Sequence, residues 1–253
     1  MKKIIVILIV GLAFTSSCSN GDTLNNGSAN TVSMNQQTLG SSSSDLLSDK
    51  KYTSMVIEVA YVTGYEPSAT AINNFVSFIE ARTFKPNGIT IVKRALPSPG
   101  FTTYTNPQFI ALEDADRTKY NTSNQIAIWA FFADGKSAAD TSTKYILGES
   151  YRNTSFIIFE NTIQKLSNNP TQPSRSLLET TVITHEFGHI LGLVNLGAPI
   201  QSNHEDTLHP NHCTDQSCLM YWLSESGNSL SNLGAAPQLD AQCIADLRAN
   251  GGR

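Results

Sequence analysis

All five histidines of this 253-residue chain lie between residues 185 and 212. Two of them, His185 and His189, stand four residues apart, and Glu186 follows the first. Residues four apart on a helix share one face about a turn apart, so both imidazoles can reach a single metal ion. Histidine is the commonest metal ligand among the side chains. The spacing therefore predicts a metal site on a helix, and such a site requires a fold in which most of that helix is buried.

The sequence around this pair predicts a helix over residues 176–191. Ser176, followed three residues later by Glu179, has the form of a capping box, and Pro173 stands just before it. The apolar side chains of this stretch recur on several faces of the helix, which predicts burial on most sides. They are Leu178, Val182, Phe187, Ile190 and Leu191.

Glu186 is expected to project beside the metal rather than onto it. There its carboxylate can take a proton from a zinc-bound water, whose pKa the metal lowers to about 7. The HExxH spacing therefore predicts Zn²⁺ as the cofactor, Glu186 as the catalytic base and hydrolysis of peptide bonds. The same spacing also arises by chance in core helices with two incidental histidines. The capped helix and the histidines downstream weigh against that interpretation.

The residues after this motif resemble the signature of the metzincins, a clan of zinc peptidases. In metzincins HExxH continues into a glycine, here Gly192, at which the chain turns sharply after the active-site helix. A third zinc histidine normally follows three residues later. This chain has Asn195 at that position, and a neutral amide is a poor zinc ligand.

A segment further on resembles the archaemetzincins. Residues 212–220, HCTDQSCLM, are similar to the archaemetzincin segment that runs from the third zinc histidine into the Met-turn. The resemblance implies His212 as the third ligand, Met220 as the floor beneath the metal, and an insertion over residues 193–211. The competing candidates for the third ligand are His204, His209, Asp206 and Asn195. Archaemetzincins also carry a later CxxC for a second zinc, and here only Cys243 stands in that region, so the second pattern is incomplete.

The cysteines near the Met-turn are candidates for a disulfide. An exported protein favours such bonds, and Cys213 paired with Cys218 would staple the loop that leads into the Met-turn. Pairing of this loop with Cys243 is the alternative, and either arrangement leaves one thiol over.

The N-terminus has the composition of an export signal. A basic start and an apolar run over residues 4–14 predict a signal peptide over residues 1–17. Cys18 then stands at a position that resembles a bacterial lipobox, so we expect a lipid anchor there. The predicted location is the extracytoplasmic side of the cell envelope, at the outer membrane in a Gram-negative cell, with secretion as the alternative. Residues 18–50, rich in Ser, Asn and Gly, are predicted to be a flexible tether.

The rest of the chain, residues 51–253, is predicted to be one catalytic domain of α/β (α+β) class. Apolar and β-branched runs predict strands over residues 55–65, 88–95, 125–132, 145–149 and 155–163. Helical spacing predicts further helices over residues 67–84, 108–120 and 237–250. Their alternation favours a mixed, mainly parallel twisted sheet, and the metzincin resemblance implies a zincin-like domain with an irregular C-terminal part ending in a helix.

Composition limits the partners. Hydrophobic residues make up 40% of the chain and charged residues 15%, which allows a packed core. The net charge of −4 excludes nucleic acid as the main partner, because phosphate binding needs a basic surface. We expect a monomer acting on a peptide or protein. A catalytically decayed zinc-binding surface lipoprotein with an adhesive role is the alternative function, supported by Asn195, and a purely structural envelope lipoprotein is a third.

Overall fold

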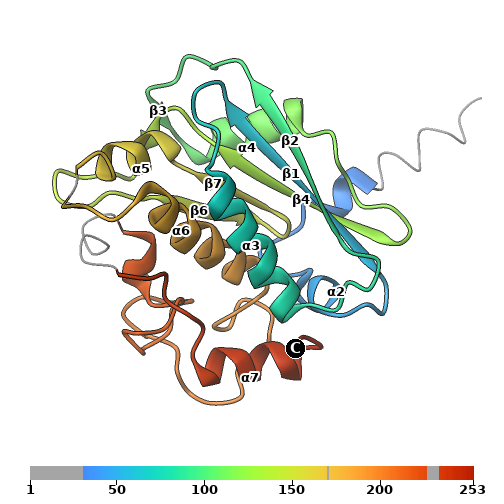
Figure 1. Ribbon diagram of the computed structural model, residues 1–253. Coiled ribbons are helices and arrows are strands. Elements are labelled where there is room, and N and C mark those ends of the chain that lie inside the picture. Colours follow the sequence, from blue (N-terminus) through green and yellow to red (C-terminus); the bar gives the residue numbers. More distant parts are fainter. Residues whose placement is uncertain (1–30, 170, 227–233) are drawn as a thin grey trace, which may run out of the picture.

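The computed structural model of the protein describes residues 31–169, 171–226 and 234–253. Its main sheet has the strand order β2-β1-β4-β7-β6, and β6 is antiparallel to its neighbour whereas the other pairs are parallel (Figure 1). These strands are β1 Ser54–Val62, β2 Ile89–Leu96, β4 Gln125–Phe132, β6 Gly148–Arg152 and β7 Ser155–Ile158. A short parallel pair, β3 Thr103–Tyr104 and β5 Lys136–Ser137, lies apart from the main sheet. The predicted mixed, mainly parallel fold class is confirmed.

Helices cover both faces of the sheet. Alternate residues of β4 show this, because Ile128 joins the core that contains Phe187 of α6, whereas Trp129 joins the core that contains Phe109 of α4. Helices α3 and α6 pack together on the first face (Figure 1). The helices are α2 Ser43–Leu47, α3 Ala69–Arg82, α4 Asn106–Asp116, α5 Glu160–Leu166, α6 Arg175–Ile190 and α7 Ala241–Ala249, with the 3₁₀ helix η1 Trp222–Glu225.

One predicted strand is partly wrong. The strand predicted over residues 155–163 ends at Ile158, and α5 begins at Glu160. The run is continuously apolar over residues 156–159 and apolar again at Ile163, so its pattern fits a buried strand and the start of a buried helix equally well. In the structure Phe159 and Ile163, four residues apart, are both fully buried at the start of the helix.

The flexible tether predicted over residues 18–50 is wrong for residues 31–50, which pack against the domain. Leu46 and Leu47 of α2 have no exposed surface and belong to the main core. The side-chain amide of Asn35 is also buried, and it donates hydrogen bonds to the Ala127 carbonyl and the Asn121 side chain. A few apolar side chains are enough to hold residues 31–50 against the domain, because the buried polar groups of this segment form hydrogen bonds with distant residues.

The predicted signal peptide over residues 1–17 and the predicted lipid site at Cys18 lie outside the described residues. Among the residues that the structure describes, no helix has the length and apolar character needed to cross a bilayer.

Candidate metal centre

Helix α6 forms the floor of the site. Its N-cap is Ser174, whose hydroxyl accepts a hydrogen bond from the Leu177 amide, so the cap lies two residues before the predicted Ser176. Glu179 takes no part in the cap, because its carboxylate accepts a hydrogen bond from the Ser68 amide at the start of α3. Every residue from Leu178 to Ile190 is buried. The predicted buried helix is therefore confirmed with a shift of one residue at each end.

Three histidines converge beside this helix. His185 and His189 point their Nε2 atoms at one another at 3.1 Å, and His212 arrives from the later loop. The ring of His212 lies 5.3 Å from that of His185 and 5.0 Å from that of His189, measured between centroids. The ligand atoms of all three lie within 4.8 Å of one another. The structure thus brings together the three side chains that the sequence singled out as ligands.

The separation of His185 and His189 fits two ligands of a tetrahedral zinc ion. Zn–N bonds of about 2.0–2.1 Å place two tetrahedral ligand nitrogens about 3.3 Å apart, close to the separation seen between His185 and His189. The other ring nitrogen of His185, Nδ1, donates to the Leu219 carbonyl at 2.7 Å. That bond fixes the tautomer, so the Nε2 lone pair is directed at the metal position.

Burial also keeps the imidazoles neutral. Burial, and then the neighbouring His212, lower the pKa of His185 to about 3. Burial likewise holds the pKa of His189 well below its usual range, and it lowers the pKa of His212. A neutral imidazole has a free lone pair, which is the form that ligates a metal.

Glu186 is positioned by the edge strand β6. Ser150 of β6 donates its hydroxyl to Oε2 of Glu186 at 2.9 Å and lies 2.8 Å from the backbone carbonyl of the same residue. Gly148 allows this approach, because a Cβ there would lie 2.7 Å from Cγ of Glu186 and 2.8 Å from a methyl of Val182. The carboxylate is therefore enclosed between α6 and the strand that ends the sheet.

Gly192 and Met220 lie on the two sides of the helix end. Gly192 has a φ of +83°, and a Cβ there would lie 2.7 Å from the Ala198 amide nitrogen, so the turn after α6 requires glycine. Met220 is fully buried against Gly188, the residue before His189, and a Cβ on Gly188 would overlap its sulfur. The methionine thus packs beneath the metal position.

The competing third ligands lie elsewhere. The His209 ring stacks on Trp222 with centroids 4.1 Å apart, and its Nδ1 bonds to Asp206. Asn195 is exposed and donates to the Glu205 carboxylate. His204 is buried in a separate cluster, described below.

No protein-family model and no curated protein matches the sequence. Among solved structures, the chain is similar to archaemetzincin from Methanopyrus kandleri, with a TM-score of 0.51 and 16% identity over 78% of this chain and 96% of that one. The chain has the archaemetzincin fold. A zinc-dependent peptidase from Methanocorpusculum labreanum gives a TM-score of 0.49 at 13% identity, covering 76% of this chain and 99% of that one. Metalloproteinase-II from Bacteroides fragilis gives 0.39 at 15% identity, covering 81% and 56%.

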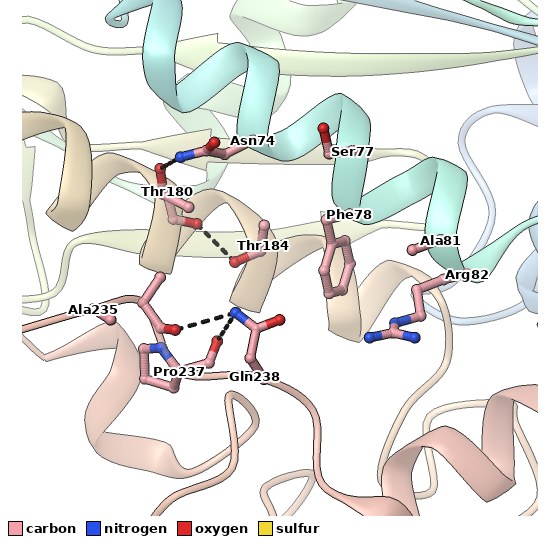
Figure 2. A pocket seen from close by; sticks show the side chains of 11 residues that line it. Asn74, Ser77, Phe78, Ala81, Arg82, Thr180, Thr184, Ala235, Pro237 and Gln238 are labelled. Carbon is pink, nitrogen blue, oxygen red and sulfur yellow. Dashed lines mark hydrogen bonds between the residues drawn. The ribbon is translucent and has the colours of Figure 1, made fainter.

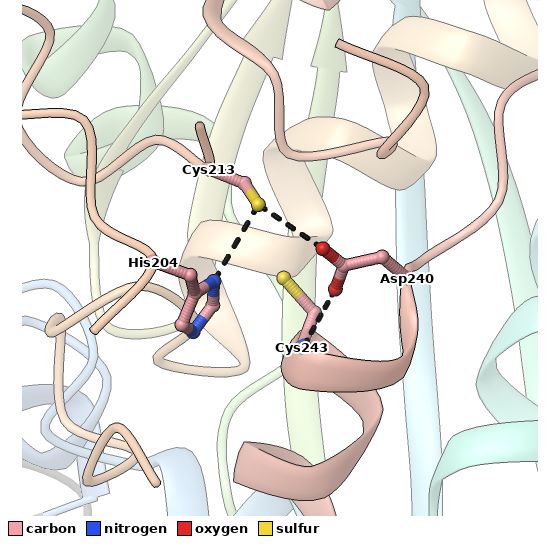
Figure 3. Close-up of side chains that lie close together, drawn as sticks. All are labelled: His204, Cys213, Asp240 and Cys243. Carbon is pink, nitrogen blue, oxygen red and sulfur yellow. Dashed lines mark hydrogen bonds between the residues drawn. The ribbon is translucent and has the colours of Figure 1, made fainter. Parts of the chain in front are cut away.

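A second cluster of side chains that could hold a metal ion lies close to Met220 in the sequence and the fold (Figure 3). It joins ligand atoms of His204, Cys213, Asp240 and Cys243 within 4.8 Å of one another. Cys218 belongs to it as well, because its sulfur lies 3.7 Å from that of Cys243. All three cysteines are free thiols, so the predicted disulfide between Cys213 and Cys218 is not formed in the structure.

Sequence reasoning missed this cluster because it looked for a second cysteine pair. Asp240 stands three residues before Cys243, at the spacing where a CxxC would place its first cysteine. One carboxylate oxygen of Asp240 caps α7 by accepting the Cys243 amide at 2.7 Å. The other accepts the Cys213 thiol at 3.2 Å. The D-x-x-C spacing was the available signal.

Two pockets adjoin α6. The one at the metal centre has a volume of about 140 Å³ and is lined by Glu186, His189 and His212 among others. A larger pocket of about 390 Å³ lies between α3, α6 and residues 235–238 (Figure 2). Its walls include Asn74 and Thr180, which bond to one another, and none of the described residues lining it is a histidine, cysteine or carboxylate. In the described part of the chain, only the smaller of these two pockets is lined by histidine and carboxylate side chains that could bind a metal.

Proposed function

We propose that the protein is a zinc-dependent peptidase. The observation that carries the proposal is the convergence of three imidazoles on one point with a buried carboxylate beside them. The archaemetzincin fold supports it, since that fold presents such a helix next to an edge strand. His185, His189 and His212 would hold the ion, and the bound Zn²⁺ would supply Lewis acidity that activates water at neutral pH.

Glu186 acts as the proton carrier in this proposal. Its carboxylate takes a proton from the attacking water and later delivers it to the leaving amine. Ser150 anchors that carboxylate through the hydrogen bond to Oε2, and this restricts the directions in which the proton can be received. The enclosed position between α6 and β6 excludes bulk water from the carboxylate.

The substrate is proposed to be an extended peptide or protein segment. Strand β6 ends the order of the main sheet and runs beside α6 at the metal centre. An extended chain can add to such an edge through backbone hydrogen bonds, which would hold the scissile bond over the metal position. Binding through the backbone along a strand favours cleavage within a chain, so we infer endopeptidase action.

We also infer a structural metal at the second cluster. The 3.7 Å between the sulfurs of Cys218 and Cys243 matches two thiolates on one tetrahedral zinc, for which Zn–S bonds of about 2.3 Å predict about 3.8 Å. Cys213, Asp240 and His204 are the candidates for the remaining two positions. Hydrogen bonds from Cys213 and Cys243 lower the pKa of the Cys218 thiol, which favours the thiolate that a metal binds.

The test of the peptidase proposal combines metal analysis with cleavage of a quenched-fluorescence peptide library. The wild-type protein should contain zinc and cleave peptides, and a chelator should stop cleavage. Glu186→Ala should keep zinc at the first site and lose cleavage by at least about 100-fold, the scale of a lost acid–base group. Glu80→Ala, an exposed change of the same kind on α3, is the matched control. Full activity of Glu186→Ala would refute the mechanism.

The adhesion alternative loses its main support. It rested on Asn195 at the expected place of the third ligand, and His212 joins the histidine pair instead. Anchoring through Cys18 on the extracytoplasmic side of the envelope stays a proposal from the N-terminal sequence.

A further inference from the structure

The segment over residues 34–43 is fastened to the end of the edge strand. The Asn153 amide, just after β6, donates to the Gln37 carbonyl at 3.1 Å. In return the Gln37 amide donates to the Asn153 side-chain oxygen, also at 3.1 Å. The side-chain amide of Asn153 donates to the Met34 carbonyl at 2.8 Å. This network fixes the segment against β6, one wall of the metal centre.

The same segment is fastened to the other wall, the turn after α6. Gly40 has a φ of +78°, and any Cβ there would overlap the Leu196 carbonyl, so only glycine allows the two backbones to approach this closely. Three residues on, the Ser43 hydroxyl donates to the Leu191 carbonyl at the end of α6. The segment therefore bridges the two elements that border the metal centre.

Leu39 lies between these two anchors. Its side chain is half-buried, packs against the main core, and lines the cavity of about 140 Å³ that also contains Glu186 and His189. Leu196 lines the same cavity. The cavity thus joins the residues of the metal centre, Glu186, His189 and His212, to an apolar part formed by the two leucines. Glu149, Ser150 and Asn211 complete its lining. Because open volume remains beside Leu39, this side chain lines the cavity rather than fills it.

We infer that Leu39, together with Leu196, forms the apolar wall of the substrate subsite next to the metal and selects an apolar side chain adjacent to the cleaved bond. The inference rests on the proposed peptidase function. The two leucines favour an apolar side chain, and they reject an acidic one because its charge would be desolvated beside the carboxylates of Glu149 and Glu186. A segment far from the histidines in sequence would then determine specificity, by carrying one side chain into the cleft.

The experiment compares cleavage profiles of the zinc-loaded wild-type protein with those of Leu39→Ala and Leu39→Lys over a peptide library. The wild type should prefer apolar residues at one position next to the cleaved bond. Leu39→Ala should weaken that preference by about 10-fold or more, the scale of a lost apolar contact in a pocket. Leu39→Lys should shift the preference at the same position towards acidic residues, with other positions unchanged.

Met34→Ala is the matched control. Met34 lies on the same segment and packs against the same core, but it does not line the cavity. The hydrogen bond from Asn153 uses the backbone carbonyl of Met34, which Met34→Ala keeps, so the profile should keep the wild-type preference. Leu39→Met, which retains an apolar side chain of similar length, should also keep that preference and shows whether position 39 tolerates change.

The outcomes separate this inference from the proposed function. If the wild type shows no chelator-sensitive cleavage, the proposed function itself fails. If the wild type cleaves and both the Ala and Lys variants keep its profile, Leu39 does not contact substrate and the inference is overturned. A uniform gain at every position in Leu39→Ala would also overturn it, because that result identifies Leu39 as an obstruction rather than a selective wall.

Discussion

Replacing Leu47 by Ala tests whether residues 31–50 are part of the folded domain. Leu47 has no exposed surface and packs in the main core, although a polar sequence surrounds it. Leu→Ala removes about three methylene equivalents at roughly 0.8 kcal/mol each, and the cavity left behind raises the cost to about 3–4 kcal/mol. For a domain of this size each kcal/mol lowers the melting temperature by about 2–4 °C, so we expect a fall of roughly 6–16 °C.

The assay is thermal unfolding followed by circular dichroism, with the zinc content of each sample measured beforehand. Leu208→Ala is the matched control, since it makes the same chemical change at a side chain that is 83% exposed. It should change the free energy of unfolding by no more than about 0.5 kcal/mol, as an ordinary surface substitution does, and the melting temperature should shift correspondingly little. If Leu47→Ala behaves like Leu208→Ala, the packing of residues 31–50 described above is incorrect.

Three further predictions concern the metal sites and a buried carboxylate. Gly148→Ala places a methyl group against the Glu186 carboxylate and should lower kcat/KM for the proposed cleavage by about 10-fold or more while zinc is retained; unchanged kcat/KM would contradict the tight approach of β6 to α6. Asp240→Ala should reduce bound metal from two equivalents to one and lower the melting temperature, whereas a wild type with one equivalent would refute the second site. Burial, and then the nearby Glu179, raise the pKa of Glu160 to about 8. Because the folded state then holds this proton over a range where the unfolded state has lost it, stability should fall as pH rises from about 4.5 to about 8. Glu160→Gln should flatten that part of the stability curve, and an unchanged slope would contradict the assignment.

The helix and its histidines could be predicted because their signals are local. The apolar spacing and the HExxH motif predicted α6 to within one residue at each end, and the continuous apolar run over residues 125–132 predicted β4. His212 was harder to identify from spacing. The insertion over residues 193–211 has no periodic pattern, and a loop can bring any of its side chains to the metal.

The parts that sequence reasoning missed depend on contacts between distant segments. Residues 31–50 have the composition of a linker, and the partners that bury Asn35 stand more than eighty residues away. The D-x-x-C spacing of Asp240 and Cys243 is only a weak metal signal, because a lone carboxylate before a helix is usually a cap. Asp240 becomes a candidate ligand only when the fold brings it to Cys213.

The packing of residues 31–50 also limits where a lipidated form of this protein could work. A chain running from Cys18 to Thr31 can extend about 45 Å at most, even when fully stretched. With a lipid on Cys18, the catalytic cleft would stay within a shell of about that thickness plus the size of the domain. A tether of this length would keep the protein from acting on substrates far from the membrane. It would also raise the effective concentration of the protein towards other proteins at the same membrane surface. The anchor would then govern which substrates are met, and the cleft which of those are cut.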